Sequence, residues 1–132
     1  AEEVLSPARY PIEKSGLARA THVRYAVVKS INSVEGSGNR FFIKDNEVEW
    51  YAKFANQGIS QCLDKRKFEA KWYAPDGTLF QGSEFSINKI DCFFARNTLE
   101  LEKTGAEPPR GMWEVKIFED DLLIDHRWFT LE

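Results

Sequence analysis

Two histidines, two cysteines and several acidic clusters are the side chains of this 132-residue chain that could take part in catalysis or bind a metal. A structural zinc site with two cysteine and two histidine ligands would have to use His22, Cys62, Cys92 and His126. Such sites bring their ligands in close pairs along the chain, whereas these four residues lie far from one another. The spacing therefore predicts no metal site, and no cofactor is expected.

Hydrolase motifs are missing as well. A serine hydrolase often presents its nucleophile in a Gly-x-Ser-x-Gly turn, and the sequence holds no such motif. The acidic run Glu119–Asp121 is most simply an exposed turn, because glycosidase carboxylates work as a pair across a cleft. One enzymatic alternative stays open. His126, near a strand end and flanked by Asp125 and Arg127, could serve a small metal-dependent or hydrolytic enzyme with neighbouring carboxylates.

The redox state of the two cysteines would indicate whether the protein works in an oxidising or a reducing compartment. Cys62 and Cys92 belong to no Cys-x-x-Cys motif, so they could form a disulfide under oxidising conditions or remain two small core residues in the cytosol. The sequence begins Ala-Glu-Glu without a methionine, which is typical of a mature protein after removal of a signal peptide. A trimmed chain would look the same. We expect an exported protein of the periplasm or cell envelope, and the state of the cysteines would test this.

Composition narrows the range of partners. A chain with 14% aromatic and 30% charged residues can bury a core and still cover its surface with polar groups, and its length suits one domain. The formal net charge of −3, with the signs interspersed, disfavours nucleic acid, which requires a clustered basic surface. No apolar stretch reaches the ~20 residues of a membrane span. A protein or glycan partner remains, and the chain itself is expected to be a monomer or a weak homodimer.

The stretch from Lys67 to Ile87 is the clearest structural signal in the chain. Apolar side chains occupy every second position of its first half, as in a half-buried strand. The central Pro-Asp-Gly supplies the φ angles of a tight turn, so the stretch predicts a hairpin. This alternation places Trp72 in the core and Tyr73 on the opposite face.

Similar alternation predicts the other strands. Residues 1–20 contain prolines and no sustained period, so we interpret them as an extended N-terminal arm, and residues 21–132 as a single domain. Arg40–Ile43 is a short apolar run. The domain is expected to hold seven strands, namely Thr21–Ile31, Glu47–Ala55, the two strands of the hairpin, Cys92–Glu102, Met112–Glu119 and Leu122–Leu131. Short strands at near-regular spacing predict an all-β fold, an antiparallel β-sandwich.

A resemblance to known domains supports the sandwich. Its residues are Trp72-Tyr73, Pro75-Asp76-Gly77, Gly111 to Ile117 and Phe129-Thr130-Leu131. They resemble a pattern of exported bacterial immunoglobulin-like and fibronectin type III-like domains, over roughly residues 47–132. The motifs of this pattern specify packing, so the resemblance implies a fold and carries over no functional residue. The cysteines do not follow the Cys…Trp…Cys arrangement of antibody domains, and any bridge here would be a different one.

The immunoglobulin-like arrangement places three strands side by side, 67–75, 111–119 and 122–131. With Trp50, Trp72 and Trp113 as core residues, Tyr73, Met112 and Phe118 face outward. The last strand is ambiguous, because one alternating set of its residues buries Asp125 and Arg127 and the other set buries His126. A β-bulge near 125–127 would turn Ile124 and Phe129 inward and Trp128 outward.

The bulged register would create a candidate binding surface made of Tyr73, Met112, Phe118, His126 and Trp128. A simpler interpretation is favoured, in which Trp128 belongs to the core and the others are scattered surface residues, because single exposed apolar residues are common. The sequence therefore predicts a non-enzymatic exported domain that binds a protein or glycan, or that positions neighbouring domains. The enzyme based on His126 is the alternative.

Overall fold

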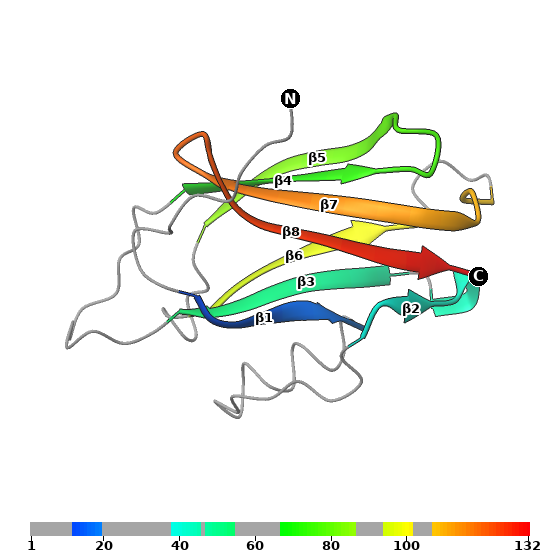
Figure 1. Cartoon of the computed structure of the whole chain (residues 1–132), viewed down its shortest axis with the longest axis horizontal. Helices are drawn as coiled ribbons and strands as arrows, with labels where there is room; N and C mark the ends of the chain where they lie inside the picture. The colour runs from blue at the N-terminus through cyan, green and yellow to red at the C-terminus, as the bar shows by residue number, and fades with distance from the viewer. Residues whose placement is uncertain (1–11, 20–37, 46, 55–66, 87–93, 102–106) are drawn as a thin grey trace.

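The computed structural model contains two β-sheets packed face to face (Figure 1). It describes residues 12–19, 38–45, 47–54, 67–86, 94–101 and 107–132. The strands formed by these residues are β1 (Ile12–Ala18), β2 (Arg40–Phe41), β3 (Glu47–Phe54), β4 (Lys67–Tyr73), β5 (Leu79–Ser86), β6 (Phe94–Glu100), β7 (Gly111–Glu119) and β8 (Leu122–Leu131). A short 3-10 helix, Ile43–Asp45, follows β2. The prediction of an all-β fold is confirmed.

One sheet has three strands in the order β1-β3-β6, and the other has five in the order β2-β8-β7-β4-β5. All neighbours pair antiparallel except β2, which runs parallel to β8. The predicted number of seven strands is wrong, because the described residues alone form eight. The extra strands are β1 and the short β2, neither of which shows an alternating pattern long enough to be recognised.

Several predictions fall partly or wholly outside the described residues. The expected strand Thr21–Ile31 lies there, and so do Cys62 and Cys92, so both the strand and the disulfide stay predictions. Within the expected arm, β1 pairs along its length with β3, and this part of the arm belongs to the three-stranded sheet. The domain boundary after residue 20 remains a prediction.

The core lies between the two sheets and is built around three tryptophans. Trp50, Trp72 and Trp113 are fully buried, as predicted. Phe129 of β8 stacks on Trp113, with ring centroids 6.1 Å apart and planes inclined by 19°. The same Phe129 ring meets Trp72 edge-on at 6.1 Å. Aromatic rings from β4, β7 and β8 therefore form one continuous packed cluster.

Polar side chains inside the sandwich join the two sheets. Trp50 Nε1 donates a hydrogen bond of 2.8 Å to Asp125 Oδ2, and Trp72 Nε1 donates one of 2.9 Å to Asn97 Oδ1. Buried polar groups are costly unless they are paired, and these pairs satisfy the two indole N–H groups. Each bond joins the three-stranded sheet to the five-stranded sheet and so fixes their relative position.

The two lateral sides of the sandwich are closed differently. On one side, Gln81 of β5 donates to Thr98 O at 2.8 Å and accepts from Glu100 N at 3.1 Å, both on β6. On the other side, the segment before β2 crosses between the sheets. Gly38 N donates to Leu17 O of β1, and Thr130 N of β8 donates to Asn39 O. Among the described residues, this second crossing lies at one end of that side.

Candidate functional site

The register of β8 decides which residues reach the surface. Ile117 of β7 pairs with Asp125, but the next residue, Phe118, pairs with Leu123, so Ile124 is an extra residue on β8. Both Ile124 and Phe129 are buried. The bulged register is therefore present, at Ile124, one residue before the range in which we expected it.

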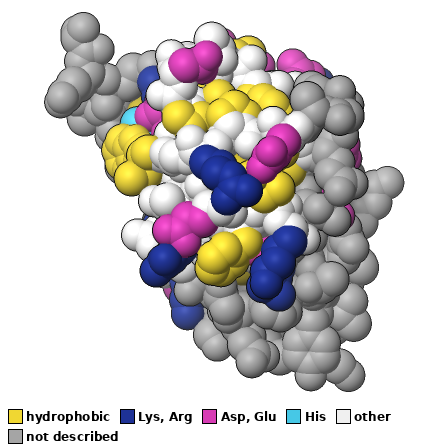
Figure 2. Space-filling model, turned by 90° about the vertical axis from the view of Figure 1, so that its right-hand side faces the viewer, with side chains coloured by type: hydrophobic (Ala, Val, Ile, Leu, Met, Phe, Trp, Pro, Cys, Tyr) yellow, Lys and Arg dark blue, Asp and Glu magenta, His cyan; other side chains and the backbone are white. Residues whose placement is uncertain are grey.

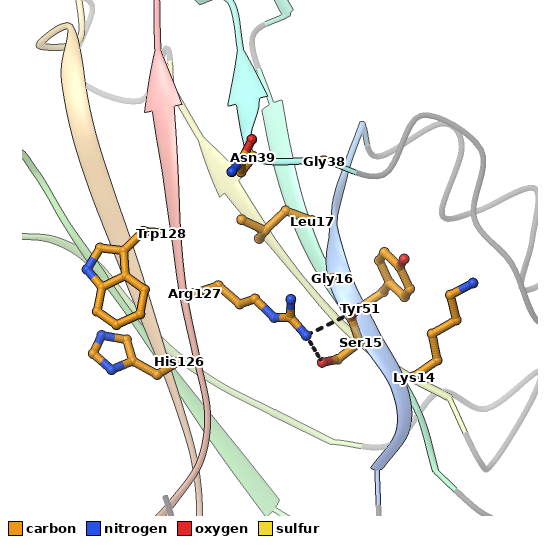
Figure 3. Close-up of a pocket in the computed structure, with 10 residues that line it drawn as sticks. All are labelled: Lys14, Ser15, Gly16, Leu17, Gly38, Asn39, Tyr51, His126, Arg127 and Trp128. Carbon is orange, nitrogen blue, oxygen red and sulfur yellow. Dashed lines mark hydrogen bonds between the residues drawn. The ribbon is translucent and has the colours of Figure 1, made fainter. Parts of the chain in front are cut away.

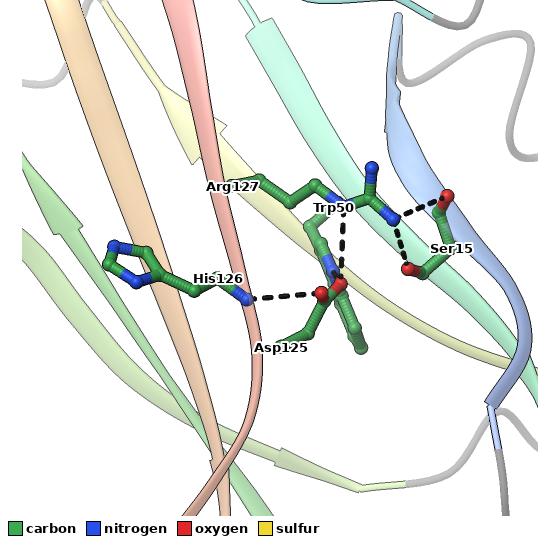
Figure 4. Close-up of polar contacts among 5 residues, drawn as sticks. All are labelled: Ser15, Trp50, Asp125, His126 and Arg127. Atoms are coloured by element: carbon green, nitrogen blue, oxygen red, sulfur yellow. Dashed lines mark hydrogen bonds and ion pairs between the residues drawn. The ribbon is translucent and has the colours of Figure 1, made fainter. Parts of the chain in front are cut away.

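Trp128 is 52% exposed, so its favoured interpretation as a core residue is wrong. The reason lies with the neighbouring polar residues of β8. Burying Asp125 looked costly from the sequence, but Asp125 Oδ2 accepts from the Trp50 indole inside the sandwich. Arg127 is accommodated at the rim, where its Nη2 donates to Ser15 O at 3.1 Å and to Ser15 Oγ at 2.7 Å (Figure 4).

The five candidate binding residues lie on one face, the outward face of the five-stranded sheet. Trp128 of β8 pairs with Glu114 of β7, which pairs with Tyr73 of β4, so these three form one row across the strands. The next row consists of His126, Lys116 and Lys71. We call this surface, together with Met112 and Phe118 at the two ends of β7, the outer face. Most of its members come from the β7–β8 hairpin, and Tyr73 comes from β4, which is distant in sequence.

His126 is held by two contacts on the outer face. Its Nε2 lies 2.7 Å from Glu114 Oε2, and its ring centroid lies 4.0 Å from that of Trp128, with the planes inclined by 32°. The imidazole is thus fixed between a carboxylate and an indole. One side of the Trp128 ring is supported by His126, while the indole as a whole stays half exposed.

Lysines partly cover the other aromatic rings of this surface. Lys116 Nζ lies 5.7 Å from the centre of the Tyr73 ring, and Lys71 Nζ lies 5.2 Å from that of Phe118. Cations at such distances are attracted to the ring faces. The most accessible apolar side chains of the outer face are therefore Trp128 and Met112, which is 56% exposed. In Figure 2, which views one end of the sandwich, hydrophobic side chains lie in separate groups between charged ones.

This geometry does not favour the alternative of an enzyme based on His126. Asp125 points into the sandwich, whereas His126 points outward, and their one contact is the bond from the His126 backbone N–H to Asp125 Oδ1 (Figure 4). The alternative in which His126 works with Asp125 is therefore not favoured, because adjacent residues of a strand face opposite sides of the sheet. His126 pairs with Glu114 instead. Within the described ranges, no three His, Cys, Asp or Glu side chains gather in a way that could hold a metal ion.

A groove of about 760 Å³ lies between β1 and β8 (Figure 3). Its walls are Lys14 to Leu17 on one side and His126 to Trp128 on the other, and Gly38 and Asn39 lie at its end. Sequence reasoning missed this groove, because residues 12–18 carry no alternating pattern that would place them opposite the last strand. Gly16 is the single residue of this segment whose type indicates that another part of the chain packs closely against it. A Cβ atom there would lie 2.9 Å from the Tyr51 hydroxyl, so the position suits glycine.

Comparison with known proteins gives information on the fold. No protein-family profile and no curated protein matches the sequence. A solved structure of an immunoglobulin-like protein from Pseudomonas aeruginosa aligns over 96% of this chain and 99% of its own, with 15% sequence identity and a TM-score of 0.53. The fold is immunoglobulin-like. At this identity the similarity extends to the fold alone, and the expected resemblance to exported bacterial domains is supported only at that level.

Two further solved structures align with TM-scores below 0.5, which is too weak to support a conclusion about fold or function. A β-glucuronidase from Bifidobacterium dentium aligns over 90% of this chain but 16% of its own, with 12% identity and a TM-score of 0.42. An endonuclease/exonuclease/phosphatase from Beutenbergia cavernae aligns over 65% of this chain and 21% of its own, with 20% identity and a TM-score of 0.35. Among the described residues, no helix has the length and apolar character needed to cross a membrane.

Proposed function

We propose that this protein is a non-enzymatic binding domain of the bacterial cell envelope that recognises a protein or glycan partner through its outer face. The observation that carries the proposal is the presence of Tyr73, Met112, Phe118, His126 and Trp128 on one side of the five-stranded sheet. Exposed aromatic side chains are enriched at binding sites, where they bury a large area with little loss of conformational freedom. Function in such sandwiches resides in surface sites of this kind.

Trp128 is the centre of the proposed surface. It is the one exposed tryptophan of the four in the chain, since Trp50, Trp72 and Trp113 are fully buried. The contact with His126 limits the freedom of its indole before any partner arrives, so less conformational entropy is lost on binding. Glu114, Lys116 and Lys71 supply charges of both signs around it, which suits a polar partner with some apolar surface.

Tryptophan fluorescence tests the proposal directly. The purified protein would be presented with a glycan array and with cell-envelope proteins, and bound material would be titrated while emission is recorded. We expect a partner that shifts the emission of Trp128, and we expect Trp128→Ala and Met112→Ser to abolish its binding. Leu122→Ser is the matched control, because Leu122 is 51% exposed but lies at the β7–β8 turn. Equal binding by Trp128→Ala and by the unaltered protein would refute the proposal.

Location in the envelope is a separate part of the proposal. An oxidising compartment would allow Cys62 and Cys92 to form a disulfide. A thiol count in denatured, unreduced protein isolated from its native host is expected to find neither cysteine free. Two free thiols would speak against this part and leave the outer face untouched. The alternative enzyme based on His126 is not favoured: Asp125 faces the other side of the sheet, and the carboxylate paired with His126 is that of Glu114.

A further inference from the structure

The groove between β1 and β8 is bordered by an edge of β8 that no described strand covers before Thr130. β2 pairs with β8 only at Thr130 and Leu131, and Thr130 N donates to Asn39 O. Backbone groups alternate in direction along a strand, so those of Trp128 and His126 point to the same side as those of Thr130, into the groove. His126 N–H donates to Asp125 Oδ1. Trp128 N–H and C=O have no hydrogen-bond partner in the part of the chain that the structure describes.

The course of the described residues explains why β2 leaves this edge of β8 without a neighbouring described strand. β2 runs beside the end of β8, but the residues just before it turn to the other sheet, where Gly38 N donates to Leu17 O at 3.0 Å. No described residue continues the line of β2 past Trp128 and His126. An unpaired strand edge is a template for another strand, and the groove gives access to it (Figure 3).

The charged side chains among the described lining residues of the groove have one sign. Within the described ranges its charged lining residues are Lys14 and Arg127 and none is acidic, and the imidazole of His126 is paired with Glu114. Arg127 Nε lies 3.5 Å from Asp125 Oδ2 and Nη2 is bonded to Ser15. Nη1 makes no hydrogen bond within the described ranges and projects away from both partners in Figure 4. A guanidinium nitrogen in this state suits a carboxylate.

We infer that the groove binds an extended, acidic peptide segment of a partner protein, which adds as a strand beside β8. The peptide backbone would pair with Trp128 N–H and C=O, one acidic side chain would reach Arg127 Nη1, and a second one would reach Lys14, whose side chain points away from Arg127 in Figure 3. This inference rests on the proposed function, since it makes the partner a protein and shares Trp128, but it places the contact at the sheet edge. An acidic saccharide matches the charge and lacks the repeating backbone N–H and C=O groups of a strand.

A random ten-residue peptide library displayed on phage, selected against the full-length protein, provides the test. We expect enrichment of sequences in which acidic residues alternate with β-branched ones. Arg127→Gln should weaken an enriched peptide about tenfold, as for loss of one charge-assisted hydrogen bond, and Lys14→Glu, which reverses a charge, should weaken it by at least as much. Lys67→Gln, at the exposed start of β4, is the control and should not weaken it. Every second N–H group of an added strand pairs with β8, so a peptide can be N-methylated either at the paired or at the unpaired nitrogens. N-methylation at the paired nitrogens should abolish binding, and N-methylation at the others should not.

The outcomes separate this inference from the proposed function. Lys14 is exposed, so Lys14→Glu is informative even if Arg127→Gln impairs folding. No enrichment, enrichment without acidic residues, or full binding by both N-methylated peptides would overturn the inference. Binding that depends on Met112 and Tyr73 but not on Lys14 would overturn the inference about the groove. It would still support the proposed binding by the outer face. Lys14-dependent binding of an oligogalacturonide, with no peptide bound, would also overturn it and would identify a saccharide partner.

Discussion

The indole nitrogen of Trp50 and the carboxylate of Asp125 lie 2.8 Å apart inside the sandwich. Trp50 belongs to the middle strand of the three-stranded sheet, and Asp125 belongs to β8 of the other sheet. The same carboxylate accepts from the backbone N–H of His126 and lies 3.5 Å from Arg127 Nε. A single buried carboxylate thus joins the core, the outer face and the groove.

Removal of this carboxylate should destabilise the fold. We expect Asp125→Ala to lower the free energy of unfolding by about 3 kcal/mol, because the buried Trp50 N–H loses its acceptor and Arg127 loses its partner. Urea denaturation followed by circular dichroism would measure the change. Asp125→Asn is the control, since its amide oxygen still accepts from Trp50, and its loss should be clearly smaller. Equal losses in the two variants would contradict the role given to the hydrogen bond.

Gln81 offers a test of how the β5–β6 side is closed. Its side-chain amide bonds to Thr98 O and to Glu100 N, much as the backbone of an added strand would. Gln81→Ala should cost about 1–3 kcal/mol, because two backbone groups of β6 lose their partner. Hydrogen exchange of the Glu100 amide should accelerate by more than the change in global stability explains. Unchanged exchange at this amide would show that solvent or another group replaces Gln81 without cost.

Gly16 and Tyr51 face each other on β1 and β3. A Cβ atom at position 16 would lie 2.9 Å from the Tyr51 hydroxyl oxygen, so Gly16→Ala must displace a buried ring. We expect a loss of about 1–3 kcal/mol, as for overpacking of a core. Tyr51→Phe removes the closest atom, and the double variant should lose less than the sum of the two single losses. Additive losses would show that the ring and the new methyl group do not meet.

Asp76 in the β4–β5 turn gives a prediction about pH. Hydrogen bonds from the Thr78 hydroxyl and backbone N–H to Asp76 Oδ1 stabilise the charged carboxylate and hold its pKa below the ordinary value. Thr78→Val removes the hydroxyl and should raise this pKa toward the ordinary ~3.9. Carbon NMR of the carboxyl group would measure both titrations. Identical titration curves would contradict the assigned cause.

The same lowered pKa fixes the sign of the pH effect on stability. A carboxyl whose pKa is lower in the folded than in the unfolded chain stabilises the fold fully above the unfolded value of ~3.9. That contribution is lost as the pH falls through the lowered pKa. The stability difference between the unaltered protein and Thr78→Val should therefore be present near neutral pH and should disappear in strong acid.

Much of the fold could be predicted because several strands alternate regularly. β4 and β7 place Trp72 and Trp113 on one face and polar residues on the other, and β8 begins and ends where the sequence indicates. The hairpin turns were recognisable as well. Asp120 and Asp121 both have positive φ, which the β7–β8 turn requires and which aspartate tolerates better than most residues.

Features that depend on tertiary partners could not be predicted. Tyr51 and Glu49 lie on the polar side of the alternation in β3, yet both are buried. Glu49 accepts hydrogen bonds from Arg96 and Thr98 of the neighbouring strand, and these partners are distant in sequence. Trp128 was misjudged for the same reason, because the partner of Asp125 lies 75 positions away. A period of two cannot show which charge will find a buried partner.

The place of β8 in the sheet has a consequence for the order of events during synthesis. β2 lies near the start of the described chain and β8 at its end, yet within the described residues β2 pairs with β8 alone. The hydrogen bond from the Trp50 indole likewise cannot form until Asp125 has been synthesised. The ribosome delivers β2 and β3 long before β8, so the sandwich cannot close until the last strand has emerged.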